Sequence, residues 1–123
     1  MDEFLKISKA ISDRNRVRIL KMLEVKPLCV CEITNILNVA NSTVSNHLSI
    51  LKESGLIIDK KDGKWVEYQI NKGKSKELQN EVLGLVSKYL NDEDETINDV
   101  ISCRKVNRLE ISMLNNNIEK LQD

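Results

Sequence analysis

The chain has 123 residues, a formal net charge of zero at neutral pH and only 3% aromatic residues. That length suits one domain, with a core built mainly from leucine, isoleucine and valine. No apolar run approaches the roughly 18 residues that a membrane helix needs, and the first ten residues lack the profile of a signal peptide. Three cysteines without such a signal argue against a disulfide framework, so we expect a cytoplasmic protein with no membrane partner.

The net charge of zero conceals an asymmetry along the chain. Residues 1–76 hold 14 lysines and arginines against 9 aspartates and glutamates, a balance of +5. Residues 77–123 hold 5 against 10, a balance of −5. A basic body suits a polyanionic partner, although many ordinary proteins show a similar division.

Apolar residues at helical spacing predict three helices in the first third of the chain. The first covers about residues 2–12, and the second follows with Asp13 as its N-cap. Pro27 disfavours helix in the residue before it and therefore ends the second helix. The third is short, about residues 29–37, and begins within the stretch LCVCE.

A fourth helix follows the turn NVAN, over about residues 42–54. Asn41 or Ser42 is its expected N-cap, and Gly55 fits the C′ position that closes it. Apolar residues at positions i, i+4 and i+7 of this helix must face the core. They are Val44, Leu48 and Leu51.

The apolar period then changes to two, which predicts a β-hairpin over residues 56–70. Asp62 and Gly63 stand between its two strands and are typical of a type I′ turn. Helix returns over about residues 74–90, and a long final helix is predicted from about residue 96 to residue 122.

Four helices, a hairpin and a further helix, in this order, are typical of a winged helix-turn-helix. We therefore predict a mainly α fold with a small β-hairpin wing. Residues 29–37 and 42–54 are the helix-turn-helix pair, and residues 56–70 are the wing. Residues 1–91 form this domain, and residues 92–123 form a C-terminal helical extension.

The face of the fourth helix opposite its apolar stripe is small and polar. Hydroxyls and amides of this size let a helix approach a DNA groove and can bond base edges or phosphates. Lysines 60, 61 and 64 cluster at the hairpin tip, where they can reach a phosphate backbone. A solvated helix face is the competing interpretation. The candidate DNA-binding residues are Ser42, Thr43, Ser45, Asn46, His47, Ser49, Lys52, Lys61 and Lys64.

His47 is the only histidine of the chain and lies at the edge of the apolar stripe. One histidine alone is a poor basis for a metal site. A phosphate contact and a packed helix histidine are the two remaining interpretations.

Four stretches resemble the ArsR/SmtB family of metal-sensing winged-helix repressors, and they are ISDRNRVRILKML, LCVCEI, NSTVSNHLSILKESGLI and KDGKWVEYQI. The resemblance covers about residues 5–90. It implies a homodimer that binds double-stranded operator DNA when metal-free and releases it on binding a toxic ion. It also implies a dimer interface formed by the first helix and the helix after the wing.

LCVCE resembles the inducer site of the family's arsenic and cadmium sensors, which implies Cys29 and Cys31 as ligands. Some arsenic sensors carry a third cysteine where this chain has Thr34, and cadmium and lead sensors add cysteines in an N-terminal extension. Zinc, nickel and cobalt sensors use histidines on the helix after the wing, and residues 74–91 have none. The implied inducer is trivalent arsenic or antimony, with no organic cofactor. Cadmium, lead or thiol oxidation is the alternative signal.

Thiolates select soft ions over calcium, magnesium or manganese. The expected helix N-terminus lowers the pKa of the Cys29 thiol, and Glu32 nearby opposes this effect. Three cysteines are too few for a structural zinc site with four ligands, whereas arsenic and antimony take only three sulfurs. Two small buried hydrophobic residues are the competing interpretation.

The C-x-C spacing also suggests a mechanism. Positions i and i+2 point about 200° apart on a regular helix, so two such sulfurs cannot bind one atom. We therefore expect an ion held by Cys29 and Cys31 to distort the first turn of their helix and to lower DNA affinity.

The predicted final helix carries Cys103, a candidate third ligand from the same or the other subunit and equally a packing residue. Two interleaved series of residues recur every seven positions and predict a coiled-coil seam. The partner is the same helix of a second subunit or the body of the same chain. The series are Ile97, Arg104, Ile111 and Ile118, and Val100, Asn107, Leu114 and Leu121.

A thiol-dependent enzyme is the hypothesis from another class. It is disfavoured because the cysteines have C-x-C spacing at a helix, and not C-x-x-C spacing in a βαβ unit. The sequence also lacks a Ser/His/Asp set, a pair of carboxylates in a cleft and a phosphate-binding glycine loop. The family resemblance therefore implies an arsenite-responsive repressor, and we expect no enzyme.

Overall fold

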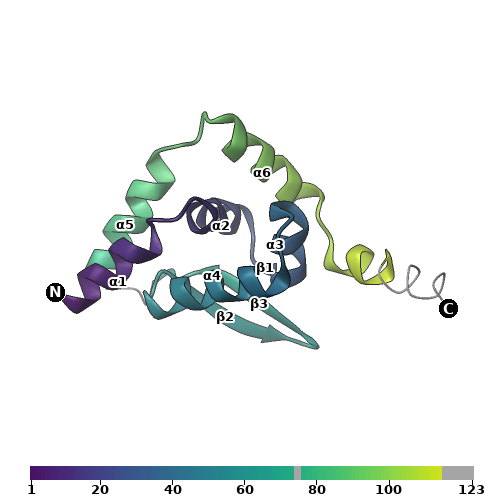
Figure 1. Cartoon of the computed structure of the whole chain (residues 1–123), viewed down its shortest axis with the longest axis horizontal. Coiled ribbons are helices and arrows are strands. Elements are labelled where there is room, and N and C mark those ends of the chain that lie inside the picture. The colour runs from purple at the N-terminus through teal and green to yellow at the C-terminus, as the bar shows by residue number, and fades with distance from the viewer. Residues whose placement is uncertain (74–75, 115–123) are drawn as a thin grey trace.

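The computed structural model describes residues 1–73 and 76–114. Figure 1 shows α5 and α6 arranged over α2, with the β2–β3 hairpin on the opposite side of the molecule. The elements, in chain order, are α1 (Asp2–Ala10), α2 (Arg14–Val25), β1 (Leu28–Cys29), α3 (Val30–Leu37), α4 (Asn41–Glu53), β2 (Ile57–Asp62), β3 (Trp65–Ile70), α5 (Glu77–Lys88) and α6 (Asp94–Lys105). The predicted winged helix-turn-helix is confirmed.

The core lies where α2, α3 and α4 meet the root of the wing. Each leucine or isoleucine buried there contributes about 1.5–3 kcal/mol of transfer free energy. The predicted stripe of α4, Val44, Leu48 and Leu51, is fully buried. The other fully buried core residues include Ile19, Leu20, Met22, Leu28, Ile33, Leu56 and Ile57.

The wing is a three-stranded antiparallel sheet with the strand order β1-β3-β2, one strand more than the hairpin pattern predicted. In the added strand, Cys29 pairs with Glu67 of β3. The hairpin turn also differs from the prediction. Its central residues are Gly63 and Lys64, and only Gly63 has a positive φ, at 60°. This fits a type II′ turn, in which glycine takes the first central position, and not the predicted type I′ turn.

The helix ends are partly as predicted. Asp13 caps α2 by accepting a 3.1 Å hydrogen bond from the N–H of Arg16, and Gly55 follows α4 with φ at 82°. The predicted cap of α4 by Asn41 or Ser42 is wrong. The N-cap is Ala40, which has no side-chain hydrogen bond to offer, and Asn41 is the first helical residue.

Lys21 fixes the connection from α5 to α6. Its buried ammonium donates to the carbonyls of Val86 (2.9 Å) and Tyr89 (3.0 Å) and to Asn91 Oδ1 (2.7 Å). These bonds satisfy the carbonyls that the end of α5 leaves without partners. The chain turns at Leu90, where φ is 68°, and α6 then runs back along α2.

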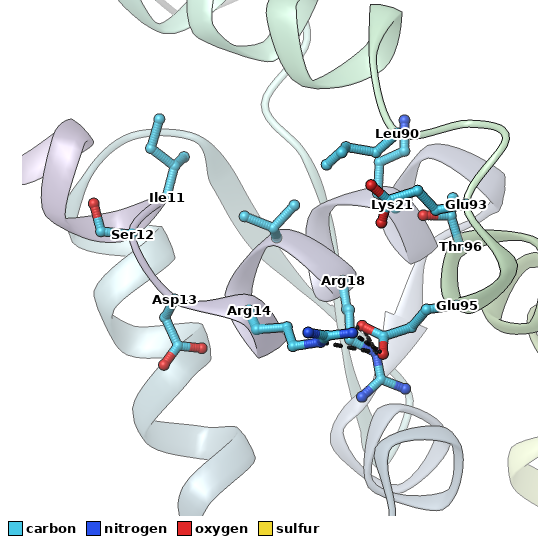
Figure 2. Close-up of a pocket in the computed structure, with 11 residues that line it drawn as sticks. Ile11, Ser12, Asp13, Arg14, Arg18, Lys21, Leu90, Glu93, Glu95 and Thr96 are labelled. Atoms are coloured by element: carbon cyan, nitrogen blue, oxygen red, sulfur yellow. Dashed lines mark hydrogen bonds and ion pairs between the residues drawn. The ribbon is translucent and has the colours of Figure 1, made fainter.

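Two arginines of α2 hold α6 in place. Arg18 donates to both carboxylate oxygens of Asp99, at 2.9 and 3.0 Å, and Asp99 is buried. Arg14 makes a paired contact of the same kind with Glu95, which also lies 3.5 Å from Arg18 (Figure 2). Packing of the tail on the body, one of the two arrangements left open by the seven-residue repeat, is the arrangement observed for α6.

The predicted single helix from residue 96 to residue 122 is wrong over its described part. α6 ends at Lys105, Val106 is extended, and residues 108–114 form a separate helical segment. Asn107 begins that segment, because its Oδ1 accepts from the N–H groups of Leu109 (2.8 Å) and Glu110 (3.3 Å). Ile118 and Leu121 of the seven-residue series lie outside the described residues.

No helix within residues 1–73 and 76–114 is long and apolar enough to cross a membrane.

Candidate thiol site and nucleic-acid interface

The polar face of α4 is exposed. Because the apolar stripe of α4 faces the core, the candidate DNA-contacting side chains on the opposite face point outward together, as in a recognition helix. His47 is the exception and is mostly buried. The exposed candidates on α4 are Ser42, Thr43, Ser45, Asn46, Ser49 and Lys52.

The wing places exposed lysines beside this face. Lys60 and Lys61 lie near the end of β2, and Lys64 lies in the turn with its ammonium 5.0 Å from the centre of the Trp65 ring. Lys52 of α4 instead makes a 2.9 Å ion pair with Asp59 of β2. That pair joins the recognition helix to the wing.

His47 packs against Arg16 of α2. Arg16 Nη1 lies 3.2 Å from His47 Nδ1. Arginine can only donate hydrogen bonds, so Nδ1 is the acceptor in this contact. The same guanidinium donates to the carbonyls of Ala10 (2.9 Å) and Lys9 (3.0 Å) at the end of α1. This arrangement corresponds to the packed helix histidine of the two interpretations.

The two cysteines of LCVCE lie side by side, with 3.9 Å between their sulfurs. The helical geometry expected for them is wrong at Cys29. This residue ends β1 and is the N-cap of α3, with extended backbone angles of −93° and 167°. Because only Cys31 is helical, the angle of 200° between positions i and i+2 does not apply. No distortion of a helical turn is needed to bring the two sulfurs together.

Burial and the neighbouring Glu32 together raise the pKa of Cys29. One of its carboxylate oxygens accepts from the Cys29 backbone N–H at 3.0 Å and from the Cys29 thiol at 2.9 Å. Burial, the hydrogen bond to Glu32 and the negative charge of Glu32 raise the pKa of Cys29 to about 12. The pKa-lowering effect that we expected from the helix N-terminus is therefore outweighed.

A mostly apolar recess opens beside the two thiols. Cys31 is partly exposed, and Cys29 is buried with only 3% of its surface accessible. The recess has a volume of about 330 Å³ and joins the start of α3 to the wing turn. It is lined by Cys29, Val30, Cys31, Asn41, Lys64, Trp65 and Val66.

Cys103 lies in the core between α6 and α2. It is fully buried, its sulfur is 4.0 Å from the carbonyl oxygen of Met22, and burial raises its pKa to about 11. Among the described residues, no three histidine, cysteine or acidic side chains are grouped closely enough to hold a metal ion. The structure therefore brings Cys29 and Cys31 together and does not group Cys103 with them.

The distance between the two sulfurs is close to the distance between two sulfurs bound to one ion. Two sulfurs bound to one tetrahedral ion through bonds of about 2.3 Å stand about 3.8 Å apart. The observed 3.9 Å is close to that distance, and the narrower angles of a pyramidal ion such as trivalent arsenic would require the two sulfurs to move slightly closer together. Cys29 and Cys31 can therefore act as a two-sulfur chelate, with any further ligand supplied from outside this group.

Arg108, which the sequence did not single out, lies against the wing near the two thiols. Arg108 donates to Asp62 Oδ2 (2.7 Å) and Glu67 Oε1 (3.1 Å), and its pKa is raised by the hydrogen bond to Asp62 and by interaction with Cys29. No local pattern indicates a wing contact for Arg108. The residue before Arg108 is Asn107, and asparagine is a preferred N-cap. This is the local signal that the predicted helix is interrupted here.

Residues 13–59 match the family described as "Bacterial regulatory protein, arsR family". An uncharacterized HTH-type transcriptional regulator of Methanocaldococcus jannaschii, MJ1325, is 41% identical over 73 residues, which cover 58% of this chain and 82% of that protein. The chain belongs to the ArsR family. This is a family of transcriptional regulators and not of enzymes.

Two further relatives of this ArsR-family chain have named functions. The arsenical resistance operon repressor of Escherichia coli strain K12 is 38% identical over 68 residues, which cover 54% of this chain and 58% of that protein. A cadmium resistance transcriptional regulatory protein, the CadC homolog of Staphylococcus aureus, is 39% identical over 74 residues, which cover 59% and 61%. The chain thus spans less than two thirds of either relative.

Solved structures share the ArsR-family fold. HlyU from Vibrio cholerae has a TM-score of 0.59 and 26% identity, over 71% of this chain and 90% of that one. The homodimeric winged helix-turn-helix domain of Mb0332 from Mycobacterium bovis has a TM-score of 0.61 and 24% identity, over 76% and 82%.

Proposed function

We propose that this ArsR-family protein is a homodimeric repressor that leaves its operator DNA when trivalent arsenic or antimony binds Cys29 and Cys31. The observation that carries the proposal is the 3.9 Å separation of the two sulfurs at the start of the helix-turn-helix. The relatives named for arsenical and cadmium resistance support a thiol-binding signal.

The position of the thiols suggests how a ligand acts on DNA binding. Cys29 pairs with Glu67 of the wing and caps α3, while its thiol donates to Glu32. Replacing the thiol proton by a ligand removes the hydrogen bond to Glu32. Loss of this bond acts on α3 and on the wing together. The ligand shifts the equilibrium between the DNA-binding conformation and the released conformation by the difference in its affinity for the two.

The chemistry of the pair favours arsenite over cadmium. Arsenous acid is neutral near pH 7 and binds two thiols by releasing two waters, so each thiol proton leaves together with a hydroxide of the acid. Cadmium binds thiolates and must release each proton to solution. The raised pKa of Cys29 opposes cadmium binding, whereas the condensation with arsenous acid releases no proton to solution and does not require the thiolate at equilibrium.

Exposed apolar residues support the proposed dimer. On α1, Phe4 and Leu5 are 57% and 54% exposed, and on α5, Leu85 and Tyr89 are 53% and 54% exposed. Large apolar side chains left exposed on a helix face are typical of a protein-binding surface. These residues lie on the two helices that the family resemblance assigned to the dimer interface.

The test is the release of a duplex carrying the operator, measured by fluorescence anisotropy under reducing conditions. Arsenite, antimonite, cadmium, lead and zinc are compared at pH 6.5 and 7.5. We expect arsenite to release DNA at the same concentration at both pH values. Cadmium, if it acts, should become about tenfold more potent per pH unit for each proton that it displaces.

Release by cadmium or lead without release by arsenite would favour the soft-metal alternative, and release by an oxidant alone would favour redox sensing.

A further inference from the structure

Arg108 connects the segment after α6 to the tip of the wing. Its Nη2 lies 2.7 Å from Asp62 Oδ2, its Nη1 lies 3.1 Å from Glu67 Oε1, and its guanidinium carbon lies 5.3 Å from the centre of the Trp65 ring. Asp62 ends β2 and pairs with Trp65 at the start of β3. One side chain from outside the hairpin therefore contacts both of its strands beside the turn.

The backbone before Arg108 is held as well. Lys26, just after α2, donates to the carbonyl of Val106 at 3.0 Å, and Asn107 caps the helical segment that contains Arg108. The Arg108 side chain is only 22% exposed, against 56% for Asp62. A planar, paired contact of this kind fixes direction as well as distance, which a lysine cannot do.

The contact also changes the charge that DNA meets at the wing. Asp59, Asp62 and Glu67 lie on β2 and β3, which also carry or flank the tip lysines 60, 61 and 64. Lys52 pairs with Asp59, and Arg108 bridges Asp62 and Glu67 and offsets one of their two negative charges. The positive charge of the tip lysines is then in excess, as contact with phosphates requires.

We propose that Arg108 is a positioning residue for the wing, so that the segment after α6 is part of the DNA-binding unit. This inference rests on the proposed function only for its DNA readout. The segment lies outside residues 13–59, which match the family.

The first test uses Trp65, the only tryptophan of the chain, and needs no DNA. We expect Arg108→Ala to increase quenching of its fluorescence by acrylamide, because the guanidinium that lies near the ring is removed. Arg104→Ala is the matched control. Arg104 is an exposed arginine on the last turn of α6 with no wing contact in the described part of the chain. Equal quenching in the two variants would overturn the proposal.

The second test measures affinity for a duplex from upstream of the protein's own gene. We expect Arg108→Ala to weaken binding about fivefold to tenfold, since two partly exposed ion pairs are lost, and Arg104→Ala to change it less than twofold. Arg108→Lys should bind with intermediate affinity, and in an Asp62→Asn background the effect of Arg108→Ala should be smaller.

Thermal unfolding shows whether the variants remain folded. Equal affinities for the alanine variants of Arg108 and Arg104 would contradict the role in DNA binding. If the wild-type protein bound no DNA, the proposed function would fall, and quenching would still decide whether Arg108 positions the wing.

Discussion

Glu32 accepts hydrogen bonds from both the backbone N–H and the thiol of Cys29, so one carboxylate caps α3 and keeps the neighbouring thiol protonated. The sequence predicts an electropositive helix end at this point, which favours thiolate. In the fold, Cys29 is buried and its sulfur lies next to the carboxylate instead of facing water. Both effects raise its pKa. At the scale of single residues, burial and one partner therefore decide the state of the thiol.

We expect Cys29→Ser and Cys31→Ser each to bind operator DNA within about twofold of wild type and to lose release by arsenite, because a single remaining thiol cannot chelate. Cys103→Ser should keep its response, since Cys103 lies in the core and is not grouped with the pair. Anisotropy titrations under reducing conditions measure both properties. Release of Cys31→Ser at the wild-type arsenite concentration would contradict the paired-ligand site, and a weakened response of Cys103→Ser would indicate a third sulfur.

Cys103 should make folding stability depend on pH at the alkaline end. Its pKa is raised from an ordinary 9 to about 11 in the fold, so the unfolded chain loses this proton first. The stabilisation is complete below pH 9 and is lost between pH 9 and pH 11, an effect of roughly 2–3 kcal/mol. Urea unfolding of wild type and Cys103→Ala at pH 8 and pH 10.5 measures it. The variant should lose less stability than wild type over this interval, and equal losses would argue against the assignment.

At the scale of elements, the helix-turn-helix and the wing are joined by polar contacts across chain segments. The Lys52–Asp59 pair links α4 to β2, and Cys29 links the start of α3 to β3 through strand pairing. The α4 helix begins without a side-chain cap, which leaves the exposed side chains of Ser42 and Thr43 on its outer face. A helix without a side-chain N-cap is typically less stable by about 1 kcal/mol.

Lys64 at the wing turn tests whether this hairpin contacts phosphate. We expect Lys64→Ala to weaken binding to all DNA sequences about equally. It should also lower the slope of log affinity against log salt concentration by about one, since one phosphate contact is lost. Arg104→Ala is the control, because it removes one positive charge from an exposed position of α6 that makes no wing contact in the described part of the chain. A loss confined to one operator variant would indicate a base contact instead.

At the scale of the whole molecule, α6 is an integral part of the fold. Arg18 and Asp99 form a largely buried pair between α2 and α6, and Cys103 of α6 is part of the hydrophobic core. Removal of one member of such a pair leaves a charge without its partner in a partly desolvated place. The exposed faces of α1 and α5 remain as the apolar surface for the proposed dimer.

Asp99→Ala should lower the free energy of unfolding by about 2–4 kcal/mol, because Arg18 keeps its charge and loses both hydrogen bonds. Glu95→Ala, at the more exposed pair with Arg14, should cost less than about 1 kcal/mol. Urea unfolding of the two variants measures the difference. Similar small losses in both would mean that α6 contributes little to the stability of the body.

The sequence by itself determined the order of the helices as far as α5, the hairpin of the wing and the exposed face of α4, because apolar period is a local property of the chain. It also singled out Cys29 and Cys31 as a pair. Tertiary structure decided the geometry of that pair, since pairing of Cys29 with Glu67, 38 positions later, takes Cys29 out of the helix and brings its sulfur to Cys31. The contacts of Arg108 with the wing and of Asp99 with Arg18 likewise join residues far apart in the chain. No spacing or propensity encodes such contacts, which exist only once the helices have packed.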